Sequence, residues 1–191
     1  MSGLKRVDMA HCPYVRWRNG GGRTRELLTW PSAQDWWVRV SVAEIEADGP
    51  FSSFAGIDRC MAVLQGEGVA LTWPRFEQRL LAGDMIAFAG ESAPECRLLD
   101  GPTRDLNLMG RRDAGRIVMR RERIPHGRWR GVFASGTLWW TDDAKATLPA
   151  YNGAAPNVLV SSLESNRINF ERGFEVNQVN TSASVDLTLT G

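Results

Sequence analysis

The sequence predicts an all-β protein, and three observations support that class. Apolar residues alternate with polar ones, as in residues 36–45 (WWVRVSVAEI), where Val38, Val40 and Val42 fall on one face of a strand. Turn signals near residues 48–50, 66–68, 83–84 and 100–102 recur every 15 to 20 residues. No ten-residue stretch has helical periodicity. Together these features are typical of an antiparallel sandwich or barrel.

The successive strands follow from the same signals. Residues 59–73 (RCMAVLQGEGVALTW) predict two strands joined by a tight turn at 66–68, which is a hairpin signal. Residues 80–90 (LLAGDMIAFAG) predict a turn followed by a short strand. Residues 95–110 (ECRLLDGPTRDLNLMG) predict a strand, an Asp-Gly-Pro turn and a second strand, in which leucines alternate with Asp105 and Asn107.

The pattern changes after residue 110. Residues 110–130 carry eight Arg against Asp113 and Glu122; such a run is usually a solvated face, and docking of a partner is the weaker alternative. Strand-like runs resume at 131–142 (GVFASGTLWWTD) and 157–163 (NVLVSSL). The similarity between VLQGEGVALTW and VFASGTLWWTD indicates a duplicated unit. We therefore expect a first β unit over residues 1–110 and a second, weaker one over residues 111–191.

Composition argues against several functional classes. A formal charge of only +1 argues against nucleic acid or a membrane surface as a partner. Three cysteines without a close pair, no signal-peptide pattern and no apolar run of membrane-spanning length predict a cytoplasmic protein with reduced thiols. With His11 and His126 as its two histidines, the chain lacks the ligand spacing of a metal site, so we expect no metal and no cofactor.

Three consecutive glycines in residues 14–28 (YVRWRNGGGRTRELL) raise the question of nucleotide binding. A P-loop requires a Gly-Lys pair, and no Lys follows here. A dinucleotide fingerprint would need a third Gly at the position of Arg25 and a following helix, which Pro31 prevents. The glycines predict instead a turn that leads into a strand, or a loop whose bare backbone a ligand can approach closely.

Polar residues alternate with apolar ones on several of the predicted strands. In an open sheet with one apolar face such residues normally point to solvent. In a small barrel they would point into its mouth and bind a ligand, with Trp17, Trp37 and Phe51 as apolar walls or as ordinary core. The polar residues concerned are Thr24, Glu26, Arg39, Ser41, Arg59, Asp105 and Asn107.

Four segments resemble the HutD/Ves family of cupin-like proteins. They are residues 17–26 (WRNGGGRTRE), 36–56 (WWVRVSVAEIEADGPFSSFAG), 58–68 (DRCMAVLQGEG) and 104–109 (RDLNLM). The resemblance covers residues 4–112 and, beyond them, RGVFASGTLWWTD at 130–142. It implies a bicupin, which consists of two antiparallel β-barrel or jelly-roll units in one chain. Typical cupins hold a metal through His-x-His and a later His; the corresponding stretches here lack both, so a cupin without metal is implied.

The resemblance also implies a function. The family is linked to stress responses and to histidine utilisation, where it senses or limits an intermediate such as formylglutamate or urocanate, with no established catalytic activity. Our first hypothesis is therefore a protein that binds a small acidic metabolite and regulates histidine catabolism. The alternative is a metal-independent isomerase or hydrolase of a small carboxylate, with Glu26 or Asp105 as general base. The oligomeric state is left open, a homodimer included.

The family's motifs imply a ligand site in the first unit. Arg39 or Arg59 would clamp a carboxylate of the ligand by charge-assisted hydrogen bonds, and Asn19 or Asn107 would contact a polar end. The glycine run would shape the rim of this site. We assign no catalytic residue. The expected ligand-binding residues are Trp17, Asn19, Glu26, Arg39, Arg59, Asp105 and Asn107.

Overall fold

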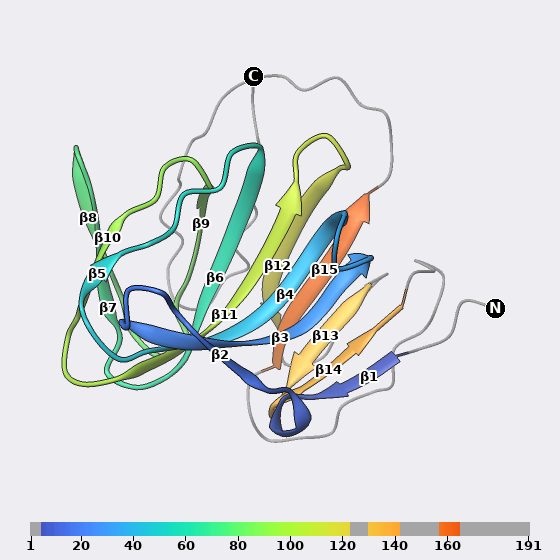
Figure 1. Ribbon diagram of the computed structural model, residues 1–191, viewed down its shortest axis with the longest axis horizontal. Coiled ribbons are helices and arrows are strands. Elements are labelled where there is room, and N and C mark those ends of the chain that lie inside the picture. Colours follow the sequence, from blue (N-terminus) through green and yellow to red (C-terminus); the bar gives the residue numbers. More distant parts are fainter. Residues whose placement is uncertain (1–4, 123–129, 142–156, 165–191) are drawn as a thin grey trace.

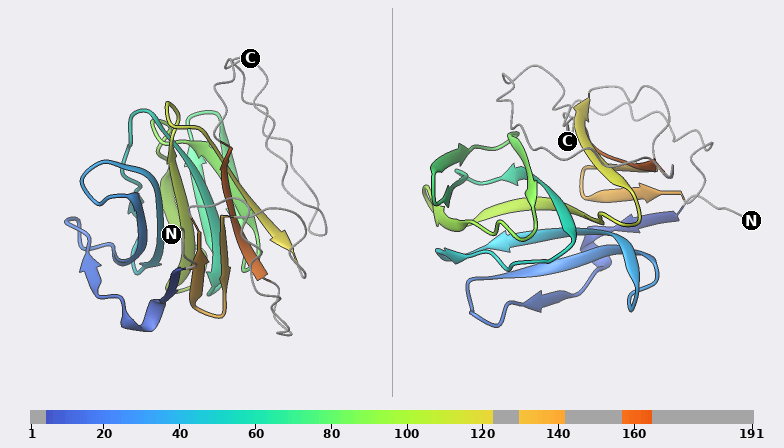
Figure 2. Two further views of the ribbon diagram at one scale, coloured as in Figure 1. Left: turned by 90° about the vertical axis from the view of Figure 1, so that its right-hand side faces the viewer. Right: turned by 90° about the horizontal axis from the view of Figure 1, so that it is seen from above.

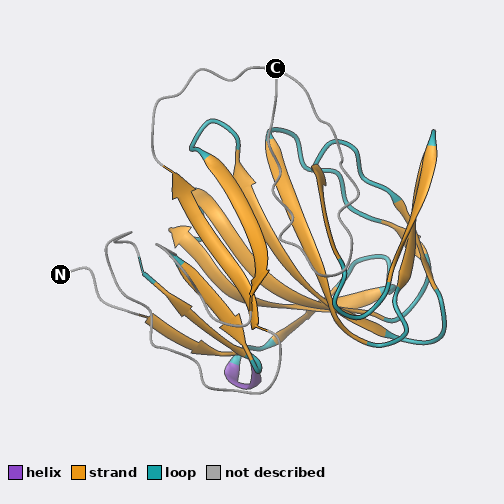
Figure 3. Cartoon of the chain, turned by 180° about the vertical axis from the view of Figure 1, so that it is seen from behind, coloured by secondary structure: helices purple, strands orange, loops and turns teal. Residues whose placement is uncertain are grey.

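Three antiparallel sheets make up the described part of the chain. The computed structural model describes residues 5–122, 130–141 and 157–164. Strands account for nearly all of the regular structure in these ranges, and one 3-10 turn, Met9–His11, is added to them (Figure 3). Among these residues we find no helix with the length and hydropathy that crossing a bilayer requires.

The six-stranded sheet lies in the middle of the molecule (Figure 1). Its strand order is β2-β3-β4-β11-β6-β9, so β11 arrives between two strands that precede it in sequence. The bounds are β2 Tyr14–Arg16, β3 Gly22–Pro31, β4 Trp36–Ile45, β6 Ile57–Gln65, β9 Met85–Ala89 and β11 Thr103–Arg111.

The four-stranded sheet packs on one face of the six-stranded sheet. Its order is β5-β10-β7-β8, with β5 Gly49–Pro50, β7 Val69–Trp73, β8 Phe76–Leu80 and β10 Glu95–Leu98. A core between the two sheets buries Met61 and Val63 of β6 against Val69 and Leu71 of β7. We call these two sheets together the first cupin-like unit.

The five-stranded sheet packs on the opposite face of the six-stranded sheet (Figure 2). Its order is β1-β14-β13-β15-β12, with β1 Lys5–Asp8, β12 Arg116–Glu122, β13 Gly131–Ala134, β14 Thr137–Trp140 and β15 Asn157–Glu164. Because β1 pairs with β14, the start of the chain completes a sheet that is otherwise built from residues after 110. The division of the chain at residue 110 stays a prediction, and residues 123–129, 142–156 and 165–191 of the predicted second unit lie outside the described residues.

The alternation in β4 explains how one strand serves two cores. Val38, Val40 and Val42 are at most 1% exposed and pack toward the five-stranded sheet, in a core that also contains Trp140. Each fully buried side chain of this kind contributes about 1.5 to 3 kcal/mol. The intervening residues, such as Arg39, belong to the other face, because side chains of a strand alternate with a period of two.

The prediction of an all-β, cupin-like chain of antiparallel sheets is confirmed, whereas the hairpin predicted at residues 66–68 is wrong. Strands β6 and β7 form on either side of this turn, but they belong to different sheets. Gly66 and Gly68 have φ of +99° and +97°, a left-handed conformation that glycine adopts without steric cost. The chain therefore turns a corner between two sheets where a hairpin would have kept it in one. The segment that resembles it in sequence, residues 131–140, does form a hairpin, β13 with β14.

Candidate functional site

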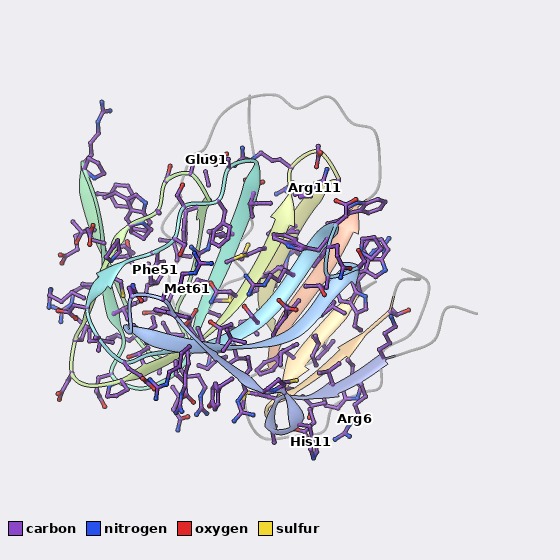
Figure 4. The ribbon with its side chains drawn as sticks, viewed as in Figure 1. Arg6, His11, Phe51, Met61, Glu91 and Arg111 are labelled. Atoms are coloured by element: carbon purple, nitrogen blue, oxygen red, sulfur yellow. The ribbon has the colours of Figure 1, made fainter. Side chains whose placement is uncertain are left out.

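Polar side chains are buried on the face of the six-stranded sheet that packs on the four-stranded sheet. Arg59 of β6, Ser41 of β4, and Asp105 and Asn107 of β11 are all 5% exposed or less. In register, Asn107 lies opposite Ser41 on one side and Met61 on the other. Met61 belongs to the core between the two sheets, and Phe51 packs against this core; both residues are labelled in Figure 4. The polar residues therefore lie inside the first cupin-like unit and not on an exposed face.

Arg59, Asn107 and Asp105 form a continuous hydrogen-bonded chain, which we call the polar cluster. Arg59 Nη2 donates to Asn107 Oδ1 over 3.0 Å, and Asn107 Nδ2 donates to Asp105 Oδ2. The asparagine amide thus separates the cation from the carboxylate, and within the described part of the chain no direct ion pair joins Arg59 to Asp105. Its two polar atoms are both used within the cluster.

Aromatic rings surround the guanidinium of Arg59. The Cζ atom of Arg59 lies 5.1 Å from the ring centroid of Phe51, 5.8 Å from that of Phe54 and 5.0 Å from that of Phe88. Cation–π attraction of this kind contributes about 0.5 to 2 kcal/mol per contact and favours the charged form. The rings also exclude water, so the charge of Arg59 is weakly screened.

Burial changes the protonation equilibria of the polar cluster. Desolvation raises the pKa of Asp105 to about 7, although the nearby charge of Arg59 and the hydrogen bond from Asn107 act in the opposite direction. Desolvation also lowers the pKa of Arg59 to about 10, partly compensated by Asp105 and reinforced by the like charge of Arg39. Arg59 therefore remains a cation at neutral pH, while Asp105 changes charge close to neutrality.

Two buried atoms of the polar cluster have no hydrogen-bond partner among the described residues. They are Oδ1 of Asp105 and Nε of Arg59. A buried polar atom without a partner costs about 1 to 3 kcal/mol, more if it is charged, so native proteins seldom leave one without a reason. One carboxylate acceptor and one guanidinium donor thus remain unpaired inside the cluster.

Glu26 and Arg39 form an ion pair at the more exposed end of the same face. Arg39 Nε lies 3.0 Å from Glu26 Oε2, and the two side chains are 24% and 44% exposed. Glu26 lies opposite Ser41 in the β3–β4 register, and Ser41 lies opposite Asn107 in the β4–β11 register. The row from Glu26 to Asn107 therefore runs from solvent to the buried cluster, with Arg39 as a second cation beside it.

Both carboxylates on this face flank a β-bulge. The β3–β4 register shifts between Glu26 and Leu28, and the β11–β6 register shifts between Arg104 and Asp105. A bulge adds one residue to a strand, bends it and redirects the neighbouring side chain. The extra residue is Leu27 in β3, next to Glu26, and Leu64 in β6, across from Asp105, a feature that alternation in the sequence does not reveal.

The loop at residues 51–56 (FSSFAG) covers Arg59 and is fixed at several points. Arg59 Nη1 donates to the carbonyl oxygen of Ser52 over 3.4 Å. The amides of Phe51 and Phe54 donate to the carbonyls of Pro94 and Gly90, each over 2.9 Å. At the end of the loop the amide of residue 56 donates to the carboxylate of Glu91, which is labelled in Figure 4.

The other two predicted site residues, Trp17 and Asn19, have contacts of their own. Trp17 is half-buried, packs at the border of the core of the first unit and donates from Nε1 to Thr24 Oγ1 over 2.8 Å. Asn19 is exposed, and its Oδ1 accepts a hydrogen bond from the amide of Gly21 over 3.0 Å. Within residues 5–122, 130–141 and 157–164, no hydrogen bond or ion pair joins either residue to the polar cluster.

The glycine run forms the turn between β2 and β3. Gly20 has a φ of +74°, and the amide of Trp17 donates to the carbonyl of Gly22 over 2.9 Å to close the turn. A Cβ atom added to Gly22 would lie 2.3 Å from the carbonyl oxygen of Glu44 and 3.1 Å from the Trp17 ring. The run therefore allows a tight turn and a close approach of two strands, as the first of the two sequence interpretations expects.

Two contributors to the site were not found by sequence reasoning. Phe88 lies on β9 directly opposite Arg59, and Phe54 lies in the loop that covers it. Phe88 belongs to residues 86–89 (IAFA), whose alternation could have placed its side chain on the inner face of the sheet. Phe54 lies in a segment without such alternation. In the described part of the chain, no three His, Cys, Asp or Glu side chains lie close enough together to hold a metal ion.

Comparison with known sequences identifies relatives of this chain. A family model described as HutD matches residues 8–156. A protein described as the uncharacterized 21.2 kDa protein in the hutC 3′ region of Pseudomonas putida is 41% identical over 112 residues, which are 57% of this chain and 59% of that protein. Protein Ves of Citrobacter koseri is 37% identical over 61% of this chain and 63% of its own length, and protein Ves of Cronobacter sakazakii is 34% identical over 73% and 81%. The matched part thus spans about three fifths of the first two relatives.

Solved structures show the same fold. The structure of HutD from Pseudomonas fluorescens SBW25 superposes with a TM-score of 0.65 at 25% identity, over 83% of this chain and 95% of that one. A conserved protein of unknown function from Pseudomonas aeruginosa PAO1 superposes with a TM-score of 0.64 at 24% identity, over 84% and 92%. Because the HutD model matches most of the sequence and agrees with the resemblance of its motifs, the chain belongs to the HutD family.

Proposed function

We propose that this protein binds a small acidic metabolite in the first cupin-like unit and regulates histidine utilisation through that binding. The observation that carries the proposal is Arg59, a cation that is 5% exposed, lies among three aromatic rings and has an unpaired Nε. A desolvated guanidinium of this kind is a strong partner for a carboxylate. The names of two relatives, HutD and the protein in the hutC 3′ region, support the link to histidine utilisation.

Arg39 makes the proposed site suited to an anion. It lies on the same face as Arg59 with one strand between them, and its like charge lowers the pKa of Arg59. An anion between the two guanidiniums would relieve their repulsion, which favours a carboxylate or dicarboxylate over a neutral ligand. Formylglutamate and urocanate, the intermediates suggested by the family, both carry such a group.

A ligand panel tests this proposal by binding and by thermal stability. The panel contains N-formylglutamate, urocanate, formate, glutamate and histidine, each added at millimolar concentration to the purified protein. We expect at least one acidic member to raise the melting temperature and to give a saturable calorimetric isotherm. In Arg59→Lys the shift should largely disappear, because an ammonium cannot reproduce the planar guanidinium, while the exposed control Arg75→Lys keeps it. If no acidic compound binds, or if Arg59→Lys binds like the wild type, the proposal is wrong.

A metal-independent enzyme is the second candidate, and one observation favours it. The pKa of Asp105 is raised to about 7, which is where a carboxylate serves best as a general base at neutral pH. Incubating each bound member of the panel with the protein and following the mixture by NMR distinguishes the candidates. Turnover that disappears in Asp105→Asn supports the enzyme, and an unchanged ligand after prolonged incubation supports the binding protein.

A further inference from the structure

Asn107 is held in one orientation by its two neighbours in the polar cluster. Its Oδ1 accepts from Arg59 Nη2 and its Nδ2 donates to Asp105 Oδ2, so both ends of the amide are occupied. Rotating the amide by 180° would direct its NH2 group at the guanidinium and its oxygen at the carboxylate, which are two mismatched pairs. Asn107 therefore positions Arg59 and Asp105, and its amide keeps one N–H and one oxygen lone pair beyond these two hydrogen bonds.

The hydrogen-bonding groups that remain unpaired in the polar cluster differ between its two ends, with a donor at Arg59 and an acceptor at Asp105. At the Arg59 end the unpaired atom is Nε, a donor that suits a carboxylate oxygen. At the Asp105 end the unpaired atom is Oδ1, and an ionised carboxylate only accepts hydrogen bonds. A simple carboxylate satisfies the first atom and repels the second. A ligand that satisfies both must present an acceptor to Arg59 and a donor to Asp105.

The spacing of the two ends suits one small molecule. Arg59 Nη2 and Asp105 Oδ2 are joined through one asparagine amide and its two hydrogen bonds, a path of roughly 8 Å at most, and each unpaired atom belongs to the same guanidinium or carboxylate as one of these two atoms. An acidic group and a neighbouring N–H of an amino-acid derivative, with a hydrogen bond of about 3 Å at each end, cover a comparable span.

We propose that Asp105 Oδ1 accepts a hydrogen bond from an N–H group of the ligand whose carboxylate Arg59 binds, so that the site selects small acids that carry an N–H, such as N-acyl amino acids, over acids of equal size without one. This inference rests on the proposed binding function and adds a specificity-determining role for Asp105. The burial of Asp105, which is 1% exposed, gives the preference its strength, because an unpaired buried carboxylate is penalised when the donor is missing.

The test compares two nearly isosteric ligands, N-acetylglutamate and 2-acetoxyglutarate, in which an ester oxygen replaces the amide N–H. Calorimetry at pH 8, where Asp105 is mostly ionised, should give wild-type protein an affinity for the amide at least about ten-fold higher than for the ester. In Asp105→Asn the side-chain oxygen accepts from Asn107, and an NH2 group, which cannot accept from the ligand N–H, replaces Oδ1. The preference for the amide over the ester should therefore fall to about two-fold or less, or reverse. Asp100→Asn, an exposed control of the same chemistry, should keep the wild-type preference.

The outcomes separate this inference from the proposed function. If the amide and the ester bind equally well and Arg59→Lys weakens both equally, the anion site stands and the role of Asp105 is overturned. A buried water that donates a hydrogen bond to Oδ1 would give this result. Absence of any binding of either acid to the wild-type protein overturns both. A wild-type preference that survives in Asp105→Asn also overturns the inference, since another acceptor would then supply the contact.

Discussion

Arg59 Nη2 donates a hydrogen bond to Asn107 Oδ1 over 3.0 Å, and this contact joins two residues that lie 48 positions apart in the sequence. It connects neighbouring strands β6 and β11 inside the first unit, where both side chains are 5% exposed. The two strands are already paired along their backbones. The side-chain bond therefore adds little to the topology and acts instead on the position and charge of the guanidinium.

Replacing Asn107 by Leu should destabilise the protein strongly. Leucine has a similar shape but leaves Arg59 Nη2 and Asp105 Oδ2 without their partner, and each lost contact with a charged group costs about 1.5 to 3 kcal/mol. We expect the free energy of unfolding to fall by about 3 to 5 kcal/mol in urea titrations at pH 7. Ser41→Ala, at the neighbouring buried position, serves as the control with a smaller loss. A change below about 1 kcal/mol for Asn107→Leu would mean that solvent already satisfies these groups.

The alternation of β4 and β11 carries enough information to predict much of the site. Because side chains alternate strictly along a strand, the valines of β4 and the leucines of β11 determine which face Arg39, Asp105 and Asn107 occupy. Sequence reasoning also placed Arg59 at the start of its strand, and the structure brings it next to Asn107.

Other features depend on contacts that the sequence does not encode locally. The place of Asn19 in a ligand site, which the family's motifs imply, stays a prediction; the structure adds that its oxygen accepts a hydrogen bond from the amide of Gly21 in the turn. The corner at residues 66–68 was predicted as a hairpin, because a glycine turn between two apolar runs does not indicate whether the second strand stays in the same sheet. Phe54 reaches Arg59 only because its loop is bound to the β9–β10 connection.

The glycines of the β2–β3 turn should differ in their tolerance of a side chain. A Cβ on Gly22 would lie 2.3 Å from the carbonyl oxygen of Glu44, so Gly22→Ala forces two paired strands apart and should cost about 1 to 3 kcal/mol. A Cβ on Gly21 would lie 3.4 Å from Asn19 Oδ1, an ordinary contact, so Gly21→Ala should change stability by less than about 1 kcal/mol. Thermal and urea unfolding of the two variants measure the difference. Equal effects of the two substitutions would contradict the close approach of these strands.

The exposed pair of Glu26 and Arg39 should affect binding more than folding. Because both side chains are partly solvated, Arg39→Ala should cost less than about 1 kcal/mol of stability. If Arg39 also binds the anion, the same change should weaken binding of N-formylglutamate by about 1.5 to 3 kcal/mol. Glu26→Gln removes a carboxylate that competes with the ligand for Arg39 and should strengthen binding a few-fold. Calorimetry of both variants tests the pair, and a Glu26→Gln variant that binds more weakly than the wild type would assign Glu26 a direct role in binding.

The stability of the protein should depend on pH through Asp105. Its pKa in the folded state is about 7, against 3.8 in the unfolded chain, so the folded protein holds a proton that the unfolded chain has released between these two values. Stability from this group is therefore fully present below about pH 4, decreases as the pH rises, and reaches its lowest level above about pH 7. The difference of roughly three pKa units sets an upper limit of about 4 kcal/mol, with relaxation of the site reducing it.

Asp105→Asn removes this titration and keeps the shape of the side chain. We expect the free energy of unfolding of Asp105→Asn relative to the wild type to increase steadily between pH 4 and about pH 8 and to level off toward pH 9, where wild-type Asp105 is ionised in both states. Urea unfolding at five pH values for both proteins measures this difference, with Asp100→Asn as the exposed control. A ligand N–H bonded to Oδ1 would favour the ionised carboxylate, so saturating N-acetylglutamate should shift the rise toward lower pH. A difference that stays constant across this range would show that Asp105 is ionised in the folded protein already near pH 4, with the charge of Arg59 compensating its burial in full.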